Sequence, residues 1–296
     1  IAIQMTGGSG VGKTEAVYTL KTILEEIGMS SCVLDQVKSH QALEDSLFRD
    51  PVCVYAPEES QDLLMSMFMD GNGGPFAGVV SSLKRFSTAS KSVIHARAGA
   101  GNEKPASVKY PHLSIWMTGI ASKVWDNLGS NMLDDGFLGR MWNLELAPCP
   151  LRQEPMVTPR GDLMLLAEIV EHCRAWLSVE NAAVDGEGKV VFSEVVGEPL
   201  SILRSADAEA LAKQFAGKAE AIRAEADKDD PIAAATWARA YVSLCKLELL
   251  AAGSRSAVKP LVEEADTARG IRLVEAIIRS TFARLATRVA ETDERQ

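Results

Sequence analysis

The 296-residue chain contains no apolar run near the roughly 20 residues that a transmembrane helix needs, and no charged-then-apolar leader opens it. Its five cysteines are scattered with no close pair, which argues against a disulfide framework and against a cysteine-rich metal site. We also find no internal repeat and no low-complexity tract. These absences predict an ordinary soluble globular protein of a reducing compartment, which we take to be the cytoplasm.

Excess positive charge is also missing, because the formal net charge is -9 at pH 7. A protein that coats nucleic acid indiscriminately neutralises phosphates with lysine and arginine, so this balance argues against that class while leaving room for a local basic element. Ile1 already lies in an apolar run, Ile1 to Met5, and we therefore expect that the numbering begins inside a longer protein. The length predicts one large domain plus an appended one.

The first 150 residues alternate between short apolar runs and stretches of helical period, which predicts an α/β domain with a mostly parallel sheet covered by helices. A helix over Lys13 to Ile27 should follow the first strand and end at Gly28. The expected strands are Ile1 to Met5, Ser31 to Asp35, Val52 to Tyr55 and Leu113 to Thr118.

The remainder of the chain is rich in alanine and leucine and predicts a mainly helical domain. A proline cluster between Pro148 and Pro159 marks the boundary, so we expect domains at 1–150 and 151–296. Valines within Lys189 to Val196 predict a strand, which could belong to a small winged element. The expected helices are Leu163 to Leu177, Ala206 to Ala226, Ile232 to Ala252 and Pro260 to Val289.

One motif carries specific chemistry, because a G-x-x-x-x-G-K-T sequence lies between an apolar run and a helix, which is the context that a P-loop requires. Its glycines allow backbone N–H groups to turn toward phosphates, Lys13 would reach the β and γ phosphates of ATP, and the Thr14 hydroxyl would ligate Mg²⁺. The alternative is a glycine turn that merely precedes a helix. The motif consists of Gly7, Gly8, Ser9, Gly10, Val11, Gly12, Lys13 and Thr14.

Two carboxylates follow the strand Val52 to Tyr55. Pro57 should end that strand and place Glu58 and Glu59 beyond the sheet edge. A hydrolysing P-loop enzyme needs one carboxylate for the magnesium shell and one to polarise water, so we assign Glu58 to the metal and Glu59 to the base. The same pair could instead open the next helix, where acidic residues favour the helix dipole.

Two further residues fit a hydrolytic site. Thr118 ends the strand that begins at Leu113, and it could sense the γ-phosphate or orient water, or it could simply end the strand. Arg140 lies in a glycine-punctuated stretch and is our candidate for an arginine finger supplied in trans, because a planar, always charged guanidinium suits phosphoryl transfer. A lone arginine more often makes a surface ion pair.

The segment from Lys84 to Lys109 reverses the charge of the chain, with six basic residues and one acid, a formal +5. Ser92 to Arg97 and Ser107 to Tyr110 predict a hairpin with Lys104 near its tip. Such a basic loop could grip single-stranded DNA in a channel, or it could be a solvated surface hairpin. The candidate contacts are Lys91, Arg97, Lys104 and Lys109.

Together these residues resemble an uncharacterised P-loop domain of phage, plasmid and mobile-element proteins, often found downstream of a primase-like region and related to replicative helicases. The layout is also similar to that of superfamily 3 helicases. One difference is Glu58, where the family usually has aspartate. The similar pieces cover nearly the whole chain and comprise Gly7 to Thr14, Ser39 to Leu43, Glu58-Glu59, Leu113 to Gly119, Gly136 to Arg140 and Trp237 to Leu250.

The resemblance implies a ring, usually a hexamer, with ATP between subunits and single-stranded DNA in the pore. The leading hypothesis is therefore a magnesium-dependent, DNA-stimulated ATPase that translocates or unwinds. A nucleotide-switched scaffold or loader would also carry a P-loop. A small-molecule kinase would need an arginine-rich lid, and the sequence shows no such lid.

Overall fold

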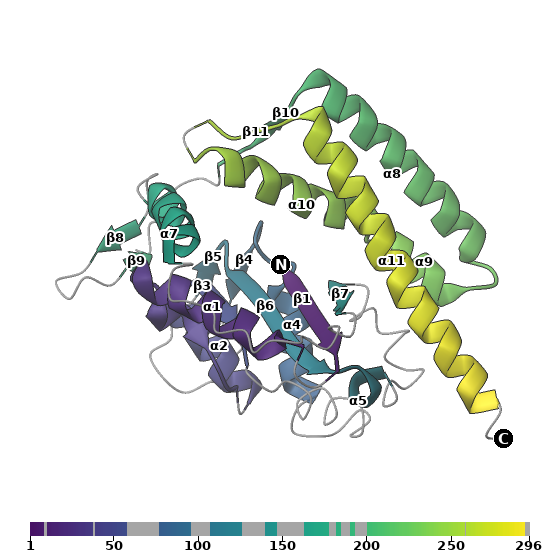
Figure 1. Ribbon diagram of the computed structural model, residues 1–296, viewed down its shortest axis with the longest axis horizontal. Helices are drawn as coiled ribbons and strands as arrows, with labels where there is room; N and C mark the ends of the chain where they lie inside the picture. Colours follow the sequence, from purple (N-terminus) through teal and green to yellow (C-terminus); the bar gives the residue numbers. More distant parts are fainter. Residues whose placement is uncertain are drawn as a thin grey trace, which may run out of the picture. The chain divides into compact units, whose positions relative to one another are not determined.

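The computed structural model describes residues 1–8, 11–37, 39–57, 77–95, 107–125, 140–146, 163–177, 182–184, 190–192, 200–257 and 259–293 (Figure 1). The chain divides into two compact units, each built from two segments. Unit 1 comprises Ile1–Val124 and Leu146–Pro199, and unit 2 comprises Trp125–Glu145 and Leu200–Gln296. The division differs from the expected domains 1–150 and 151–296, because residues 125–145 group with the helical part and residues 146–199 with the sheet.

A five-stranded sheet has the order β2-β3-β6-β1-β7. The pairs β2–β3, β3–β6 and β1–β6 are all parallel, which confirms the predicted α/β class with a mostly parallel sheet. The third strand has the bounds that its valine-rich pattern predicts. The strands are β1 (Ala2–Gly7), β2 (Val33–Leu34), β3 (Val52–Tyr55), β6 (His112–Ile120) and β7 (Trp142–Glu145).

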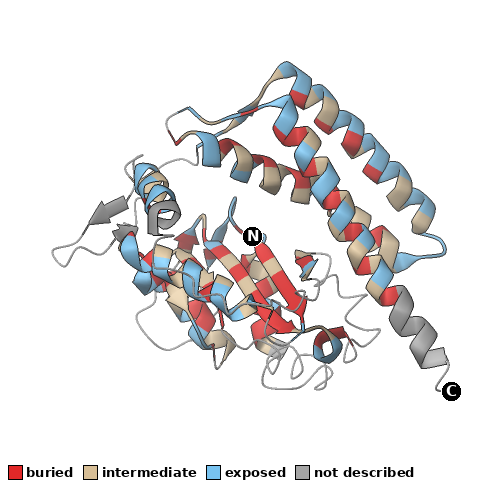
Figure 2. Ribbon diagram, in the orientation of Figure 1, coloured by how far each residue is buried: buried red, intermediate tan, exposed pale blue. Residues whose placement is uncertain are grey.

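Helices cover both faces of this sheet. The helices α1 (Lys13–Glu26) and α7 (Leu163–Leu177) pack with Val52 and Val54 of β3 in one hydrophobic cluster. The helices α2 (His40–Arg49) and α4 (Ala77–Phe86) pack against each other and contact β3 and β6. Side chains alternate along a strand, so the buried Leu113 and Met117 of β6 point away from the α1 face. Buried residues accordingly alternate with half-buried ones along much of β3 and β6 (Figure 2).

Local signals in the sequence set the ends of these helices. α1 ends as predicted at Gly28, which has a φ of 78° that favours glycine, and its N–H donates to the Glu25 carbonyl at 2.9 Å. α2 begins after Ser39, whose hydroxyl accepts from the Ala42 N–H at 3.2 Å. A 3-10 turn (Ser30–Cys32) follows α1, and a short helix α5 (Ala121–Trp125) follows β6.

Two antiparallel hairpins accompany the sheet. The predicted basic hairpin is confirmed in its paired strands, β4 (Val93–His95) and β5 (Ser107–Lys109). The strand expected within Lys189 to Val196 is β9 (Val190–Phe192), and it pairs with β8 (Ala182–Val184). A winged element around this second pair stays a prediction.

Unit 2 is built mainly from the helices α8 (Ala206–Ala226), α9 (Pro231–Trp237), α10 (Ala240–Arg255) and α11 (Glu264–Asp293). A short parallel pair, β10 (Leu203–Arg204) with β11 (Leu261–Val262), joins their ends. Alanines in the core allow α8 and α10 to approach closely, while larger side chains fill the remaining space. The main core cluster is Ala212, Phe215, Ala219, Ala240, Leu244, Val274 and Ile278.

Two helix predictions for this unit need correction. The helix expected over Ile232 to Ala252 is two helices, because Arg239 donates its N–H to the Thr236 carbonyl at 3.1 Å, three residues back, and interrupts the α-helical register. The helix expected from Pro260 begins instead at Glu264. Leu261 and Val262 pair as a strand, and the Asp266 carboxylate accepts from the Glu263 N–H at 2.8 Å just ahead of the helix.

A buried charge network ties the strand pair to the helices. The Arg204 guanidinium donates to Glu248 at 2.7 Å, to Glu209 at 3.1 Å and to the Tyr241 hydroxyl at 3.1 Å. Thr267 donates to the other oxygen of Glu248 at 2.6 Å. The hydrogen bond to Glu248 is the largest of the contacts that raise the pKa of Arg204. Because Glu248 is only 1% exposed, loss of the arginine would leave a buried charge without compensation.

Two helical glycines in this unit predict opposite effects of the same substitution. A Cβ at Gly217 of α8 would meet no atom within 4 Å, so Gly217→Ala should stabilise the protein by about 1 kcal/mol through helix propensity. A Cβ at Gly270 of α11 would lie 2.7 Å from Cδ1 of the buried Leu244, so Gly270→Ala should destabilise it by about 1 kcal/mol or more. Urea unfolding followed by circular dichroism measures both, and equal signs would contradict the packing described.

Candidate functional site

The glycine-rich segment lies at the carboxyl end of β1, in unit 1. β1 pairs with β6 in parallel from Ala2 opposite Ile115 to Gly7 opposite Ile120, so both strands end at the same edge of the sheet. This register sets Thr118 beside Met5, two residues before the last residue of β1. In open parallel sheets ligands bind outside the carboxyl ends of the strands, and the segment lies at that edge.

Two glycines are required here for different reasons. A Cβ at Gly7 would lie 3.0 Å from Cγ2 of Val11 and 3.2 Å from Cβ of Leu146, closer than side chains normally pack. Leu146 is held in place because its N–H donates to the Thr6 carbonyl at 2.8 Å. Gly12 has a φ of 85°, a left-handed conformation that only glycine adopts at little cost. The chain thus turns sharply from strand to helix.

The Lys13 side chain folds back over this turn. Its ammonium donates to the Gly7 carbonyl at 3.1 Å and to the Gly8 carbonyl at 2.5 Å. Burial lowers the pKa of Lys13 below that of an ordinary lysine, because the charged form loses part of its hydration. Within the described part of the chain, both hydrogen-bond partners of this ammonium are neutral carbonyls, so its charge would gain from a nearby anion.

The amino terminus of α1 completes the site. The residue that caps it is Gly12, which has no side chain to accept a hydrogen bond from the first N–H groups of the helix. These N–H groups and the helix dipole favour an anion at this point. Thr14, in the first turn, is exposed, and its hydroxyl is accessible to a ligand. The described part of the segment therefore fits a phosphate group with a cation at Thr14, whereas Ser9 and Gly10 lie outside the described residues.

Of the other predicted hydrolytic residues, the structure describes Thr118 and Arg140. Thr118 is 3% exposed and lies on β6, between the strand that leads into the glycine segment and the strand that precedes Glu58 and Glu59. Those two glutamates lie outside the described residues, and their roles stay predictions. Arg140 is half-buried and belongs to unit 2. Within the described residues, no group of three or more histidine, cysteine, aspartate or glutamate side chains could hold a metal.

Two of the four predicted DNA contacts of the basic hairpin lie within the described residues. Lys91 and Lys109 are exposed, and the register places Lys109 opposite Val93. Arg97 and Lys104 fall in residues 96–106, outside the described part of the chain. Arg85 of α4 donates to the His95 carbonyl at 3.1 Å, which fastens the hairpin to a helix of unit 1.

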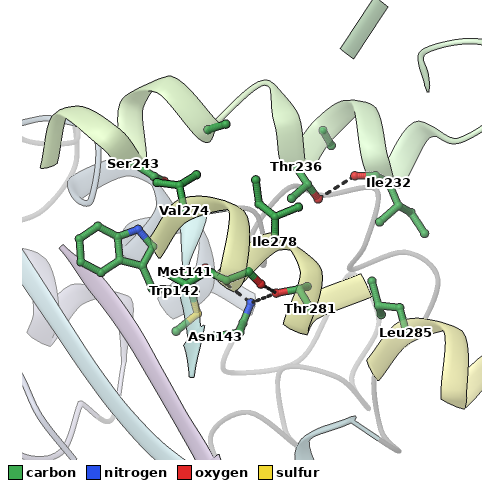
Figure 3. Close-up of a pocket in the computed structure, with 13 residues that line it drawn as sticks. Met141, Trp142, Asn143, Ile232, Thr236, Ser243, Val274, Ile278, Thr281 and Leu285 are labelled. Atoms are coloured by element: carbon green, nitrogen blue, oxygen red, sulfur yellow. Dashed lines mark hydrogen bonds between the residues drawn. The ribbon is translucent and has the colours of Figure 1, made fainter. Parts of the chain in front are cut away.

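Unit 2 encloses a cavity between β7, α9, α10 and α11 (Figure 3). Asn143 is 4% exposed there, and its amide nitrogen donates to the Thr281 hydroxyl at 3.5 Å. Its amide oxygen has no hydrogen-bond partner among the described residues. The volume is about 30 Å³, so the cavity holds one or two water molecules and is too small for a metabolite.

Sequence reasoning missed a group of cations in unit 2. Lys246 is half-buried on α10, and its pKa is lowered by burial and by the charges of Arg239 and Arg140. No motif signals this group, because Arg140 lies about a hundred residues before Arg239 and Lys246 in the sequence. The spacing of Arg239 and Lys246 on one helix was the only available signal.

No protein-family model matches the chain, and no curated protein matches it either. Among the described residues no helix is long and apolar enough to cross a membrane. The candidate site therefore depends on its own geometry: a glycine-rich turn, a folded-back lysine and an uncapped helix terminus at the carboxyl edge of a parallel sheet.

This geometry predicts that the first two glycines of the segment are not equivalent. Gly7→Ala should lower the free energy of unfolding by about 1–3 kcal/mol, because its Cβ would press on Val11 and on the fixed Leu146. Gly8→Ala is the matched control, since its Cβ would come no nearer than 3.9 Å to Val11. Urea unfolding of both variants measures the difference, and equal losses of stability would refute the tight packing at Gly7.

Proposed function

We propose that the chain is an ATP-hydrolysing motor that works on single-stranded DNA as a ring, most simply a hexamer. The observation that carries this proposal is the segment from Gly7 to Thr14. Its sequence is that of a P-loop, and its described residues lie at the carboxyl edge of a parallel sheet, where phosphates are bound. In such a motor ATP supplies the free energy and Mg²⁺ neutralises charge on its phosphates.

Each predicted residue then has a role that the chain itself can perform. Lys13 exchanges its carbonyl partners for phosphate oxygens, and the first N–H groups of α1 bind the same anion. Thr14 and Glu58 would hold Mg²⁺, and Glu59 would accept a proton from the attacking water. Thr118 supports the proposal through its position, because β6 lies between β1 and β3 at the same edge. Arg140 would act from a neighbouring subunit.

The DNA contact is proposed for the basic hairpin, with exposed Lys91 and Lys109 at its base. A few cations in a channel suffice to grip a phosphate backbone, which agrees with an acidic protein that carries one basic element. Such a motor would work in the cytoplasm, and a primase-like region could precede Ile1. The second candidate is a nucleotide-switched scaffold or loader, which the same loop geometry would serve without unwinding.

Nucleotide binding should depend on the ammonium of Lys13. Lys13→Ala should weaken binding of a fluorescent ATP analogue in magnesium buffer by about 10- to 100-fold, because one charge-assisted contact is lost. The matched control is Lys21→Ala on the same helix, whose ammonium pairs with Asp35 at 2.6 Å and should not affect binding. If wild type and Lys13→Ala bind equally, the nucleotide site is not here.

Mixing two inactive variants tests the ring. Lys13→Ala and Arg140→Ala should each abolish ATP turnover alone, yet a mixture should recover part of it. Some interfaces between subunits then combine an intact Lys13 on one subunit with an intact Arg140 on its neighbour. The measurement is phosphate release in the presence of oligo-dT, which should stimulate the wild type severalfold.

The remaining outcomes of the same assay separate the alternatives. A mixture that stays inactive would exclude Arg140 as a residue acting in trans. ATP binding with slow turnover that oligo-dT leaves unchanged would favour the switched scaffold, and absence of strand displacement on a forked duplex would support it. Transfer of phosphate to an acceptor other than water would indicate a kinase.

A further inference from the structure

The hairpin β4–β5 and the helix before it carry positive charge without an acid in their own sequence. Residues 77–95 and 107–112 contain four lysines and arginines and no aspartate or glutamate. Arg85 lies 3.6 Å from a carboxylate oxygen of Glu44 on α2. Lys91 and Lys109 are exposed, and neither makes an ion pair within the described part of the chain. The hairpin therefore presents two uncompensated ammonium groups to solvent.

The strand pairing gives this hairpin one buried face and one open face. Ile94 lies opposite Val108, and both are 6% exposed, whereas Val93 lies opposite Lys109 and both are exposed. Opposite residues of an antiparallel pair share a face, so Val93 and Lys109 lie together on the open one. Lys91 lies two residues before Val93, at the same end of the hairpin as Lys109. An exposed apolar side chain is thus accompanied by positive charge at this end.

Tyr110 lies at the same end of the hairpin, in a backbone conformation that is costly for an aromatic residue. Its φ is 50°, and it is the one non-glycine residue with a positive φ in the part of the chain that the structure describes. Its N–H donates to the Ser92 carbonyl at 2.9 Å, which fixes it across from the residue after Lys91. The ring is half-buried, and its hydroxyl makes no hydrogen bond to any described residue. Strained residues of this kind cluster where a ligand is held.

An aromatic ring beside two lysines has the chemistry of a base-stacking site. Proteins bind single strands with cations along the phosphates and with aromatic rings on which bases stack. We propose that Tyr110 stacks against one base of single-stranded DNA while Lys91 and Lys109 bind the adjacent phosphates. Every base has a π face, so this contact holds a strand of any sequence, as a translocating protein requires. The inference rests on the proposed function, which places DNA at this hairpin, but it needs neither ATP nor a ring.

Fluorescence anisotropy of labelled oligo-dT, titrated with the full chain in the absence of ATP, tests the stacking contact. Tyr110→Gly should weaken binding about tenfold or more because the ring is lost, whereas Tyr110→Phe keeps a ring and should bind like the wild type. Glycine suits a φ of 50°, so Tyr110→Gly should keep the far-UV circular dichroism of the wild type. The matched control is Tyr18→Ala, which removes an exposed tyrosine of the same unit and should leave binding unchanged.

An abasic strand of the same length separates stacking from a structural role of the ring. It keeps the phosphates and lacks the bases, so the wild type and Tyr110→Gly should bind it equally. Lys109→Met should instead weaken binding of both strands and lower the slope of log affinity against log salt by about 0.7. Equal weakening of both strands by Tyr110→Gly would show that the ring only supports the hairpin, and would overturn the proposal.

The same titrations distinguish this inference from the proposed function. If the wild type binds oligo-dT in a manner that needs Lys109 but not Tyr110, the DNA contact stands and the stacking is refuted. If the wild type does not bind oligo-dT at all, the DNA contact of the proposed function is refuted together with the stacking. Lys13→Ala should bind oligo-dT like the wild type, because the stacking site does not include the glycine-rich segment.

Discussion

The parallel pairing of β1 with β6 is the constraint on which the candidate site depends. It ends both strands at one edge of the sheet, sets Thr118 beside Met5, and delivers the chain at Gly7 into a space bounded by Val11 and Leu146. A Cβ would pack tightly there, so glycine suits this position, and Gly12 then starts α1 from a left-handed conformation. The direction of the first helical N–H groups follows from this turn and not from any side chain.

Two positively charged residues of unit 2, Arg204 and Lys246, have opposite surroundings. Arg204 is surrounded by Glu248, Glu209 and a tyrosine hydroxyl, so its charge is fully compensated inside the unit. Such a network stabilises one arrangement of strands and helices and leaves no capacity for a ligand. The pKa of Lys246, two residues before Glu248, is instead lowered by burial and by the charges of Arg239 and Arg140. The compensated Arg204 therefore has a structural role.

The sequence predicted well those features that depend on local patterns. The strand Val52–Tyr55, the helices over 163–177 and 206–226, and the stop at Gly28 all follow from hydrophobic period and glycine chemistry. Prediction failed where pairing across the chain decides the outcome. Leu261 and Val262 have a helix-compatible composition but pair with β10, and the break at Arg239 is set by one hydrogen bond to Thr236. Residues 125–145 group with the later helices, which no local signal reveals.

The residues of the candidate site also differ in how far the sequence alone reveals them. The glycine-rich motif could be recognised because consecutive residues carry its chemistry, and the structure adds why a side chain at Gly7 would be crowded. The group of Arg140, Arg239 and Lys246 could not be recognised from the sequence, because no motif links Arg140 to the other two residues. Thr118 lies between these cases, since its strand was evident but its place between β1 and β3 required the sheet order.

Lys13 is a partly buried lysine with a lowered pKa, and its surroundings restrict the ligand that it can bind. Lys13 must give up bonds to two backbone carbonyls before it binds an anion, so a ligand is favoured there only if it also satisfies the N–H groups of the turn and of α1. That requirement selects an extended polyphosphate over a single small anion. A single small anion such as sulfate should therefore fail to compete with ATP at the glycine-rich turn.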